Sequence, residues 1–198
     1  MILASTFGVF YQEGRSFILD INSVDHILFI IAVCAVYLLK DWRKVGIILL
    51  AFTIGYTLSL CLAANRVINV NYEVIEYLIP VTIFITAVSN VLKKQYTFYK
   101  KNLQSNYFFA LVFGIIHGFG FSQHLKSLVN DIPSFWQTFA YIVGLELAHV
   151  IVILLFLIGS YIFVNIININ RRDWNLVISS AIAGIAITLM FESRYWIN

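Results

Sequence analysis

Long apolar runs alternate with short polar segments along most of the chain. A helix that crosses the hydrocarbon core of a bilayer needs about 20 mostly apolar residues, and most of these runs approach or reach that length. The pattern predicts an all-α fold, a polytopic transmembrane helical bundle of about six spans in a single membrane domain over residues 1–198. The apolar runs lie near residues 26–39, 45–64, 74–92, 106–122, 135–167 and 174–191.

The N-terminal residues 1–22 do not follow this pattern. In MILASTFGVFYQEGRSF, the apolar stretch is interrupted by Gln12, Glu13 and Arg15. Such a segment is typical of an interfacial or re-entrant helix, which we predict here. A seventh span in this segment would bury Glu13, Arg15 and Asp20 in lipid, at about 2.5–3.5 kcal/mol for each charge.

Basic residues indicate the orientation of the spans. Every second connection is basic, and short cytoplasmic loops of membrane proteins carry an excess of Lys and Arg. We therefore expect these connections inside the cell, and the remaining connections and both termini outside. The net charge of +3 does not indicate nucleic-acid binding, because the basic residues do not form one stripe. The basic residues of these alternate connections are Lys40, Arg43, Lys44, Lys93, Lys94, Lys100, Lys101, Arg171 and Arg172.

Composition supports a lipid bilayer as the surrounding medium. The chain is 61% hydrophobic and 12% charged, with a mean hydropathy of +0.87. Soluble domains average about 45–50% apolar and about 25% charged residues. The fifth run, of about 33 residues, would measure about 50 Å as one helix and exceed a hydrocarbon core of about 30 Å. We therefore expect it to tilt, break or protrude.

Ionisable side chains occur in the outer half of four predicted spans. Each charged group in lipid costs at least about 2.5–3.5 kcal/mol, so such residues usually pair, face a cavity or bind a ligand. Because four spans supply them at one depth, we predict that they converge, whereas His124 is expected at the surface of an outer loop. The residues within spans are Asp25, His26, Glu76, His117, Glu146 and His149.

The chemistry of this set favours a metal site. Carboxylates and imidazoles without a nearby thiolate suit zinc, nickel, cobalt, iron or manganese better than copper(I). GLELAH places Glu146 and His149 three residues apart on one helix face, as in the Glu-x-x-His motif of helical-bundle metal sites. In FGIIHGFGF, Gly114 and Gly118 allow another helix to approach closely. The predicted metal ligands are Asp25, His26, His117, Glu146 and His149.

Four stretches, in matching order over about residues 14–155, carry a family resemblance. They are GRSFILDINSVDHILFIIAVCAVYLLKDWRKVGIILLAFTIGYTLSL, VIEYLIPVTIFITAVSN, FGIIHGFGFS and GLELAHV. Together they resemble the HupE/UreJ family of bacterial membrane proteins, in a Bacteroidetes-like form. The resemblance implies a multi-pass protein of the bacterial cytoplasmic (inner) membrane, linked to hydrogenase or urease maturation and to nickel or cobalt uptake. With the orientation predicted from the basic connections, both termini lie in the periplasm. Family motif positions are occupied by Asp25, His26, Glu76, Asn90, His117 and Glu146.

Two positions depart from the family pattern by losing an imidazole. Phe17 in GRSFI and Tyr56 in FTIGY stand where the family has histidines. A tyrosine can still donate a hydrogen bond or bind a metal weakly. His149 stands where the family usually has glutamine, and its imidazole would replace one of the two lost nitrogen ligands. We interpret Tyr56, Glu76 and Asn90 as supporting residues of the site.

Three functions fit these residues. The first is binding or transport of a divalent transition metal, nickel, zinc or cobalt, at an outer-half site. The second is an intramembrane zinc-dependent hydrolase acting on a lipid or amide, with the three span histidines on zinc and Asp25 or Glu146 as general base. The third is a non-catalytic membrane scaffold with a degenerate metal site. These residues do not decide whether the chain is an enzyme. A homo-oligomer or a metalloenzyme-maturation partner is compatible with each of the three functions.

Overall fold

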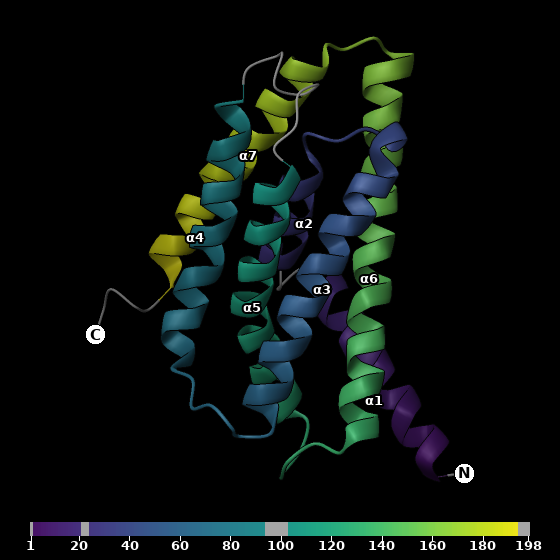
Figure 1. Cartoon of the computed structure of the whole chain (residues 1–198), viewed down its shortest axis with the longest axis vertical. Helices are drawn as coiled ribbons and strands as arrows, with labels where there is room; N and C mark the ends of the chain where they lie inside the picture. Colours follow the sequence, from purple (N-terminus) through teal and green to yellow (C-terminus); the bar gives the residue numbers. More distant parts are fainter. Residues whose placement is uncertain (1, 21–23, 94–102, 194–198) are drawn as a thin grey trace.

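The computed structural model describes residues 2–20, 24–93 and 103–193. This part of the chain is helical and contains no strand, so the predicted all-α bundle is confirmed. From α3 onward, consecutive long helices run in opposite directions along the long axis of the molecule (Figure 1). The elements are α1 (Ile2–Leu19), α2 (Val24–Cys34), the 3-10 turn η2 (Leu39–Asp41), α3 (Trp42–Ala64), α4 (Tyr72–Val91), α5 (Leu103–Ser127), α6 (Phe135–Tyr161), the π-helical turn η4 (Ile162–Ile166) and α7 (Arg171–Glu192).

The number of spans depends on α1 and α2. Among the described residues, five helices are long and apolar enough to cross a membrane alone, and α1 with α2 brings the total to six if this bent pair counts as one span. The two helices are inclined by 68°. The expected first span near 26–39 was wrong in extent, because α2 has only 11 residues and reaches about 16 Å.

Side chains from other helices explain why α2 ends early. Asn90 donates from Nδ2 to the carbonyl oxygen of Ala32 at 2.6 Å, and Arg171 donates from Nη2 to that of Val36 at 2.6 Å. Arg171 also pairs with Asp41, at 3.1 Å from Nη2 to Oδ2. Carbonyls at a helix end need partners, and here α4 and α7 supply them in place of a further helical turn.

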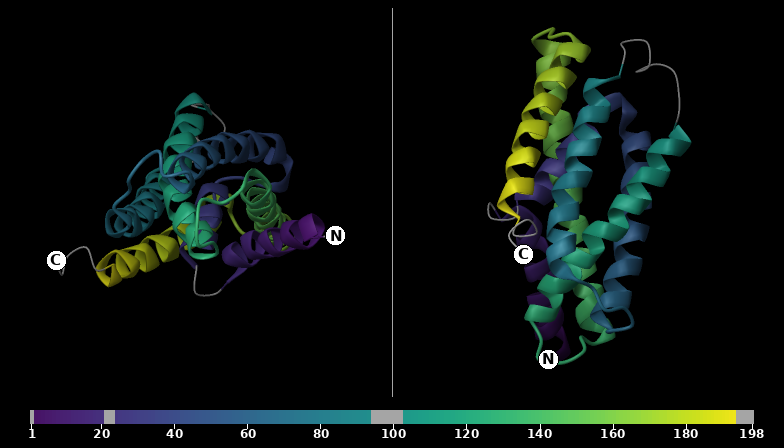
Figure 2. Two further views of the ribbon diagram at one scale, coloured as in Figure 1. Left: turned by 90° about the horizontal axis from the view of Figure 1, so that it is seen from below. Right: turned by 90° about the vertical axis from the view of Figure 1, so that its left-hand side faces the viewer.

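The bundle is built from helix pairs around a central short helix. α3 packs with α5, α1 with α6, and α4 with α7. Viewed along the bundle, α2 lies between these pairs (Figure 2). Six of its residues are buried, among them His26. The start of α2 is therefore surrounded by other helices.

Glycines allow α3 and α5 to touch backbone to backbone. A Cβ atom on Gly114 would overlap the carbonyl oxygen of Phe52, and one on Gly118 would overlap that of Tyr56. Small residues at such contacts are the usual way for helices in lipid to gain packing energy. The close helix approach expected beside His117 is confirmed.

The N-terminal segment forms a helix that lies along α6. A Cβ atom on Gly14 would overlap the carbonyl oxygen of Tyr141, and one on Gly144 would overlap that of Tyr11. Figure 1 places the start of α1 at the same end of the bundle as the connection between α5 and α6. The segment expected to be interfacial or re-entrant is thus an 18-residue helix packed lengthwise on α6.

The fifth apolar run changes its helix type near its end. Ser134 starts α6 by accepting a hydrogen bond from the backbone N–H of Gln137, with a reciprocal bond that completes a capping box. Beyond Tyr161 the run continues as the π-helical turn η4. Phe135–Ile166 is therefore one helix of 32 residues with a π-helical end, and the run does not break. Its length of about 48 Å exceeds that of the hydrocarbon core, so the helix must tilt or protrude.

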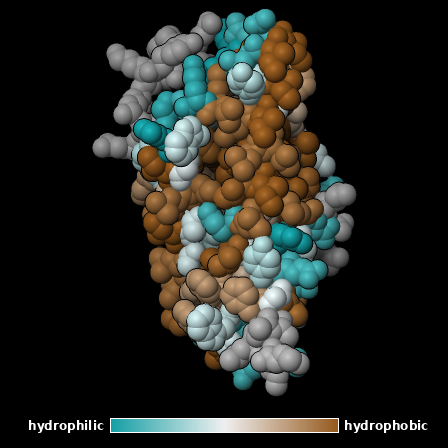
Figure 3. Space-filling view, turned by 90° about the vertical axis from the view of Figure 1, so that its right-hand side faces the viewer, coloured by the Kyte–Doolittle hydropathy of each residue, from teal (hydrophilic) through white to brown (hydrophobic). Residues whose placement is uncertain are grey.

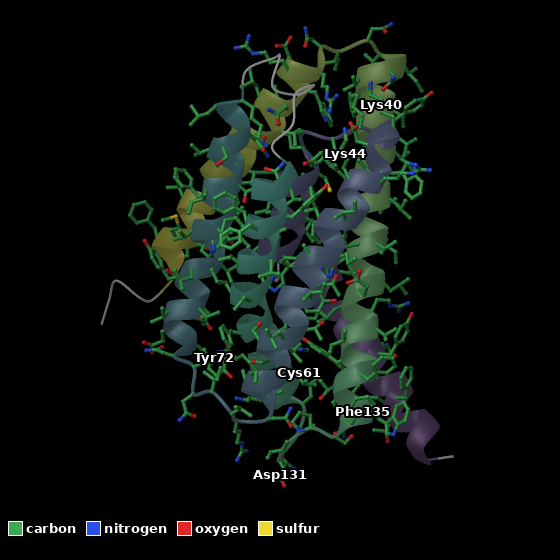
Figure 4. All side chains as sticks on the ribbon, viewed as in Figure 1. Lys40, Lys44, Cys61, Tyr72, Asp131 and Phe135 are labelled. Carbon is green, nitrogen blue, oxygen red and sulfur yellow. The ribbon has the colours of Figure 1, made fainter. Side chains whose placement is uncertain are left out.

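Apolar residues cover most of one side of the bundle, and polar residues gather near its two ends (Figure 3). The side at the right of Figure 1 carries a broad hydrophobic surface, with hydrophilic residues near the ends and in one patch of the lower half (Figure 3). Lys40 and Lys44 lie at one end, and Tyr72, Asp131 and Phe135 lie at the other (Figure 4). The long apolar helices make this chain a multi-pass membrane protein, as predicted.

Candidate functional site

Three buried histidines from different helices meet inside the bundle. His26 on α2, His117 on α5 and His149 on α6 are 5%, 0% and 1% exposed. The ring centroids of His26 and His117 lie 5.6 Å apart. The ring of Phe121 contacts all three, with centroid distances of 4.9, 6.4 and 6.1 Å to His26, His117 and His149. We call these histidines, with Asp25 and Glu146, the histidine cluster.

Asp25 orients the first histidine. Its Oδ1 lies 2.7 Å from Nδ1 of His26. Because an ionised carboxylate only accepts hydrogen bonds, Nδ1 of His26 carries a proton, and in the neutral imidazole Nε2 then keeps a lone pair. This Nε2 atom is buried and has no hydrogen-bond partner among the described residues. A carboxylate that fixes the tautomer of a histidine in this way is common beside metal ligands.

Thr82 of α4 orients the second histidine. The threonine hydroxyl donates to the carbonyl oxygen of Ile79 at 2.7 Å and lies 3.2 Å from Nε2 of His117. A hydroxyl has one proton, so Nε2 of His117 is the donor in the second contact. The other ring nitrogen of His117, Nδ1, then carries a lone pair, and it too is buried without a partner in the described structure.

Glu146 and His149 lie on one face of α6 without forming a hydrogen bond. Tyr56 donates its hydroxyl to Oε2 of Glu146 at 2.8 Å, and the hydroxyl of Thr53 lies equally close. Nδ1 of His149 is 3.9 Å from the same oxygen, which is too far for a hydrogen bond. Within the described residues that nitrogen has no partner. Glu146 is thus held by α3, and Nδ1 of His149 lies near it without a hydrogen bond.

Asp25 also faces an open groove between α2, α4 and α7. The groove has a volume of about 640 Å³, and Glu76 and Glu192 lie on its wall. Glu76 is held from α5 by Gln123, whose Nε2 donates to Oε1 at 3.3 Å. Three carboxylates on one groove create a negative potential that attracts cations. The groove connects this acidic surface to the Asp25–His26 pair.

Both positions that depart from the family pattern lie at the histidine cluster. The ring of Phe17 is 5.2 Å from that of His26 and stacks on His124 at 4.2 Å. The ring of Tyr56 lies 5.7 Å from that of His149. An imidazole at either position would therefore have joined the same group of side chains.

His124 was expected at the surface, and this expectation was wrong. Its ring is half-buried against Phe17, and its Nδ1 lies 3.0 Å from the hydroxyl of Tyr141. A spacing of seven residues from His117 places both histidines on one side of α5, and this spacing was the signal available in the sequence. Thr82 had no comparable signal, because nothing distinguishes it from other threonines in the spans.

The predicted ligands do not form one closed ligand set. Within the described residues there is no group of three or more His, Cys, Asp or Glu side chains placed to hold a metal ion. Asp25 pairs with His26, and Glu146 lies beside His149 on another helix. Ligation by more than two of these residues would require their side chains to move together.

Asn90 lies apart from the histidine cluster. It is eight residues beyond Thr82 on α4, about 12 Å along the helix. Its amide binds Ala32, and its carbonyl oxygen accepts from Asn175 at 2.9 Å. Its contacts are therefore with the end of α2 and with α7.

The fold and the buried imidazoles define a helical membrane protein with a polar site inside its bundle. A family model described as HupE / UreJ protein matches residues 2–196, essentially the whole chain. The protein therefore belongs to the HupE/UreJ family, and a membrane role related to metal follows from that membership. Comparisons with curated proteins and with solved structures gave no match.

Proposed function

We propose that this protein binds a divalent transition metal, nickel or cobalt, at the histidine cluster and carries it into the cell. The observation that supports this proposal most strongly is the set of three unpartnered ring nitrogens: Nε2 of His26, Nδ1 of His117 and Nδ1 of His149. A buried polar atom without a partner costs about 1–3 kcal/mol. An ion that accepts lone pairs would relieve this cost at each nitrogen that binds it, and the side chains would have to move for one ion to reach more than two of them.

The donor set suits such an ion. His26 and His117 each have a defined tautomer that leaves one bare nitrogen, and Asp25 adds a carboxylate beside them. Imidazole and carboxylate ligands suit nickel, cobalt and zinc. Glu146 and His149 are the second pair of candidate ligands, and Tyr56 holds Glu146 in place. The bound metal is cargo that has to be released, so a ligand set divided between helices is compatible with transport.

The acidic groove gives the ion access to Asp25 from one side of the membrane. Glu76 lies in the second turn of α4, at the end of the bundle away from Lys40 and Lys44. If the basic connections face the cytoplasm, as short basic loops do, this end faces the periplasm of the bacterial inner membrane. Cations would then be attracted to the groove from outside the cell.

Metal content is the first test of this proposal. Detergent-purified protein would be incubated with nickel, cobalt or zinc, separated from free ion and analysed by mass spectrometry. We expect near-stoichiometric metal in the wild type and none in Asp25→Ala/His117→Ala, because α2 and α5 then each lose a donor. The double variant Asn130→Ala/Asp131→Ala, in the exposed connection between α5 and α6, is the matched control and should keep the metal.

Flux measurements separate binding from other activities. Wild-type protein in proteoliposomes should move labelled nickel or cobalt inward, and Asp25→Ala/His117→Ala should not. Absence of metal in the wild type with every ion would contradict the proposal and leave the scaffold function. Bound zinc with release of a fatty acid or amine and without flux would instead identify a hydrolase.

A further inference from the structure

A second polar region lies between α4 and α5, away from the histidine cluster. It is a partly open cavity, which we call the α4–α5 cavity, and its empty space of about 550 Å³ includes the space at its open side. In the right-hand view of Figure 2, α4 and α5 lie close together near one end and separate toward the other. α2 and α3 supply the remaining wall, through Val33 and Ile48. The polar residues on its wall are Tyr37, Thr86, Ser89, Asn90, Lys93 and Asn106.

Lys93 supplies the charge of this cavity. Its Nζ donates to Oδ1 of Asn90 at 2.9 Å, which leaves further N–H groups of the ammonium available. No carboxylate of the described residues lines the cavity or pairs with Lys93. Burial lowers the pKa of Lys93. An anion bound here would compensate for the desolvation of this ammonium.

The amide groups around Lys93 form a fixed frame. Asn90 binds the end of α2 through Ala32 and accepts a hydrogen bond from Asn175 of α7 at its backbone carbonyl. Asn106 of α5 donates from Nδ2 to the hydroxyl oxygen of Tyr37 at 3.1 Å. Because that oxygen accepts from Asn106, the proton of the Tyr37 hydroxyl is free to be donated to a ligand.

The outer wall of the cavity is apolar and faces the lipid side of the bundle. Ile85 of α4 and Phe109 of α5 lie on opposite sides of the cavity and are 45% and 48% exposed. Phe113 continues the apolar wall inward, where it is 9% exposed. A ligand in this cavity would therefore contact the ammonium of Lys93 and the hydroxyl of Tyr37 at one end, and the apolar side chains of Ile85 and Phe109 along its side.

We infer that the α4–α5 cavity binds an anionic phospholipid, with its headgroup phosphate on Lys93 and Tyr37 and an acyl chain against Ile85 and Phe109. Basic pockets between helices near the cytoplasmic side of a membrane suit anionic headgroups. The apolar flank favours an amphiphile over a free phosphate. The ammonium of Lys93 opposes a metal cation, so this cavity does not continue the cation site.

Lipid titration of delipidated, detergent-purified protein, followed by native mass spectrometry, tests this inference. Short-chain phosphatidylglycerol, short-chain phosphatidylcholine and glycerol phosphate would be compared. Both lipids carry the phosphate, but phosphatidylcholine adds a choline cation that Lys93 repels, so we expect the wild type to bind phosphatidylglycerol about tenfold more tightly, a difference of about 1.4 kcal/mol. Lys93→Gln should lose this preference, and Lys93→Arg should keep it. Lys40→Gln removes an exposed lysine at the same end of the bundle and should also keep it.

Two results would overturn the inference. One is an unchanged preference for phosphatidylglycerol in Lys93→Gln protein that elutes as a monodisperse species. The other is displacement of phosphatidylglycerol by glycerol phosphate at matched concentration, which would show that a free phosphate is sufficient. Since metal binding is measured separately, neither result affects the proposed function.

Discussion

The histidine cluster and the α4–α5 cavity are two polar regions of one apolar bundle, and they differ in charge and in packing. The cluster combines imidazoles with Asp25 and Glu146 and opens to an acidic groove. The cavity has Lys93 and amides on its wall, and no carboxylate of the described residues lines it. The sign of the fixed charge therefore distinguishes the proposed cation site from the proposed anion site within one bundle.

The same helix, α5, contributes to both regions through different contacts. Near the cluster, Gly114 and Gly118 bring it against α3 with no space for a side chain. Near the cavity, Asn106 and Phe109 line the space between α5 and α4. Close packing buries His117 completely, whereas the separation of the helices leaves the space beside Lys93 in which we propose that a ligand binds. Packing distance, as well as charge, distinguishes the two regions.

The largest expected effect comes from breaking the close packing beside the cluster. In Gly118→Ala, the new methyl group would overlap the backbone oxygen of Tyr56 and the hydroxyl of Ser59. Overpacking against backbone should lower the free energy of unfolding by about 3 kcal/mol. Gly46→Ala on α3 is the control, because no atom lies within 4 Å of its new Cβ. It should change stability by less than about 1 kcal/mol.

Thermal unfolding in detergent, followed by tryptophan fluorescence, measures both variants. A Gly118→Ala protein as stable as the wild type would contradict the close α3–α5 contact. Metal content in the same samples would then show whether the cluster depends on this contact.

A smaller effect is expected from adding a donor to the cluster. Phe17→His would place an imidazole where the phenyl ring now lies 5.2 Å from His26. An added ligand should tighten metal binding about tenfold, which corresponds to about 1.4 kcal/mol. Phe7→His is the matched control, since Phe7 on the same helix contacts Phe139. Calorimetric titration with nickel measures both, and equal affinities for Phe17→His and wild type would argue against ligation near His26.

The smallest effect is expected from the acidic groove. Glu76→Gln removes one of three carboxylates and should lower the initial rate of metal uptake about two- to three-fold at low salt, with less effect at high salt because ions screen the field. Glu73→Gln, exposed on the first turn of the same helix and outside the groove, should not change the rate. Lys93→Gln should also leave it unchanged, and a loss with Lys93→Gln would show that the two regions are not independent.

The sequence predicted the helical class because lipid imposes a simple rule on the chain. Each span must be long and apolar, so α3 to α7 could be predicted from hydropathy. The spacing of Gly114 and Gly118 predicted a close contact between two helices. The rule failed for α2, because its end is set by side chains from α4 and α7 that lie far away in the sequence. Hydropathy carries no information about such partners.

The candidate site was also predicted only in part from the sequence. The histidines and carboxylates could be identified as candidates from the sequence, because an ionisable group in an apolar span is unfavourable unless it pairs or binds a ligand. The sequence alone therefore determined the helical membrane class and indicated which side chains are candidate metal ligands. Only the tertiary structure decided which of these side chains lie close together and that Phe17 and Tyr56 lie beside them. It also decided that Asn90 accepts a hydrogen bond from Lys93 instead of contacting the histidines. Contacts between helices depend on packing angles and small-residue seams, which join residues from distant parts of the chain.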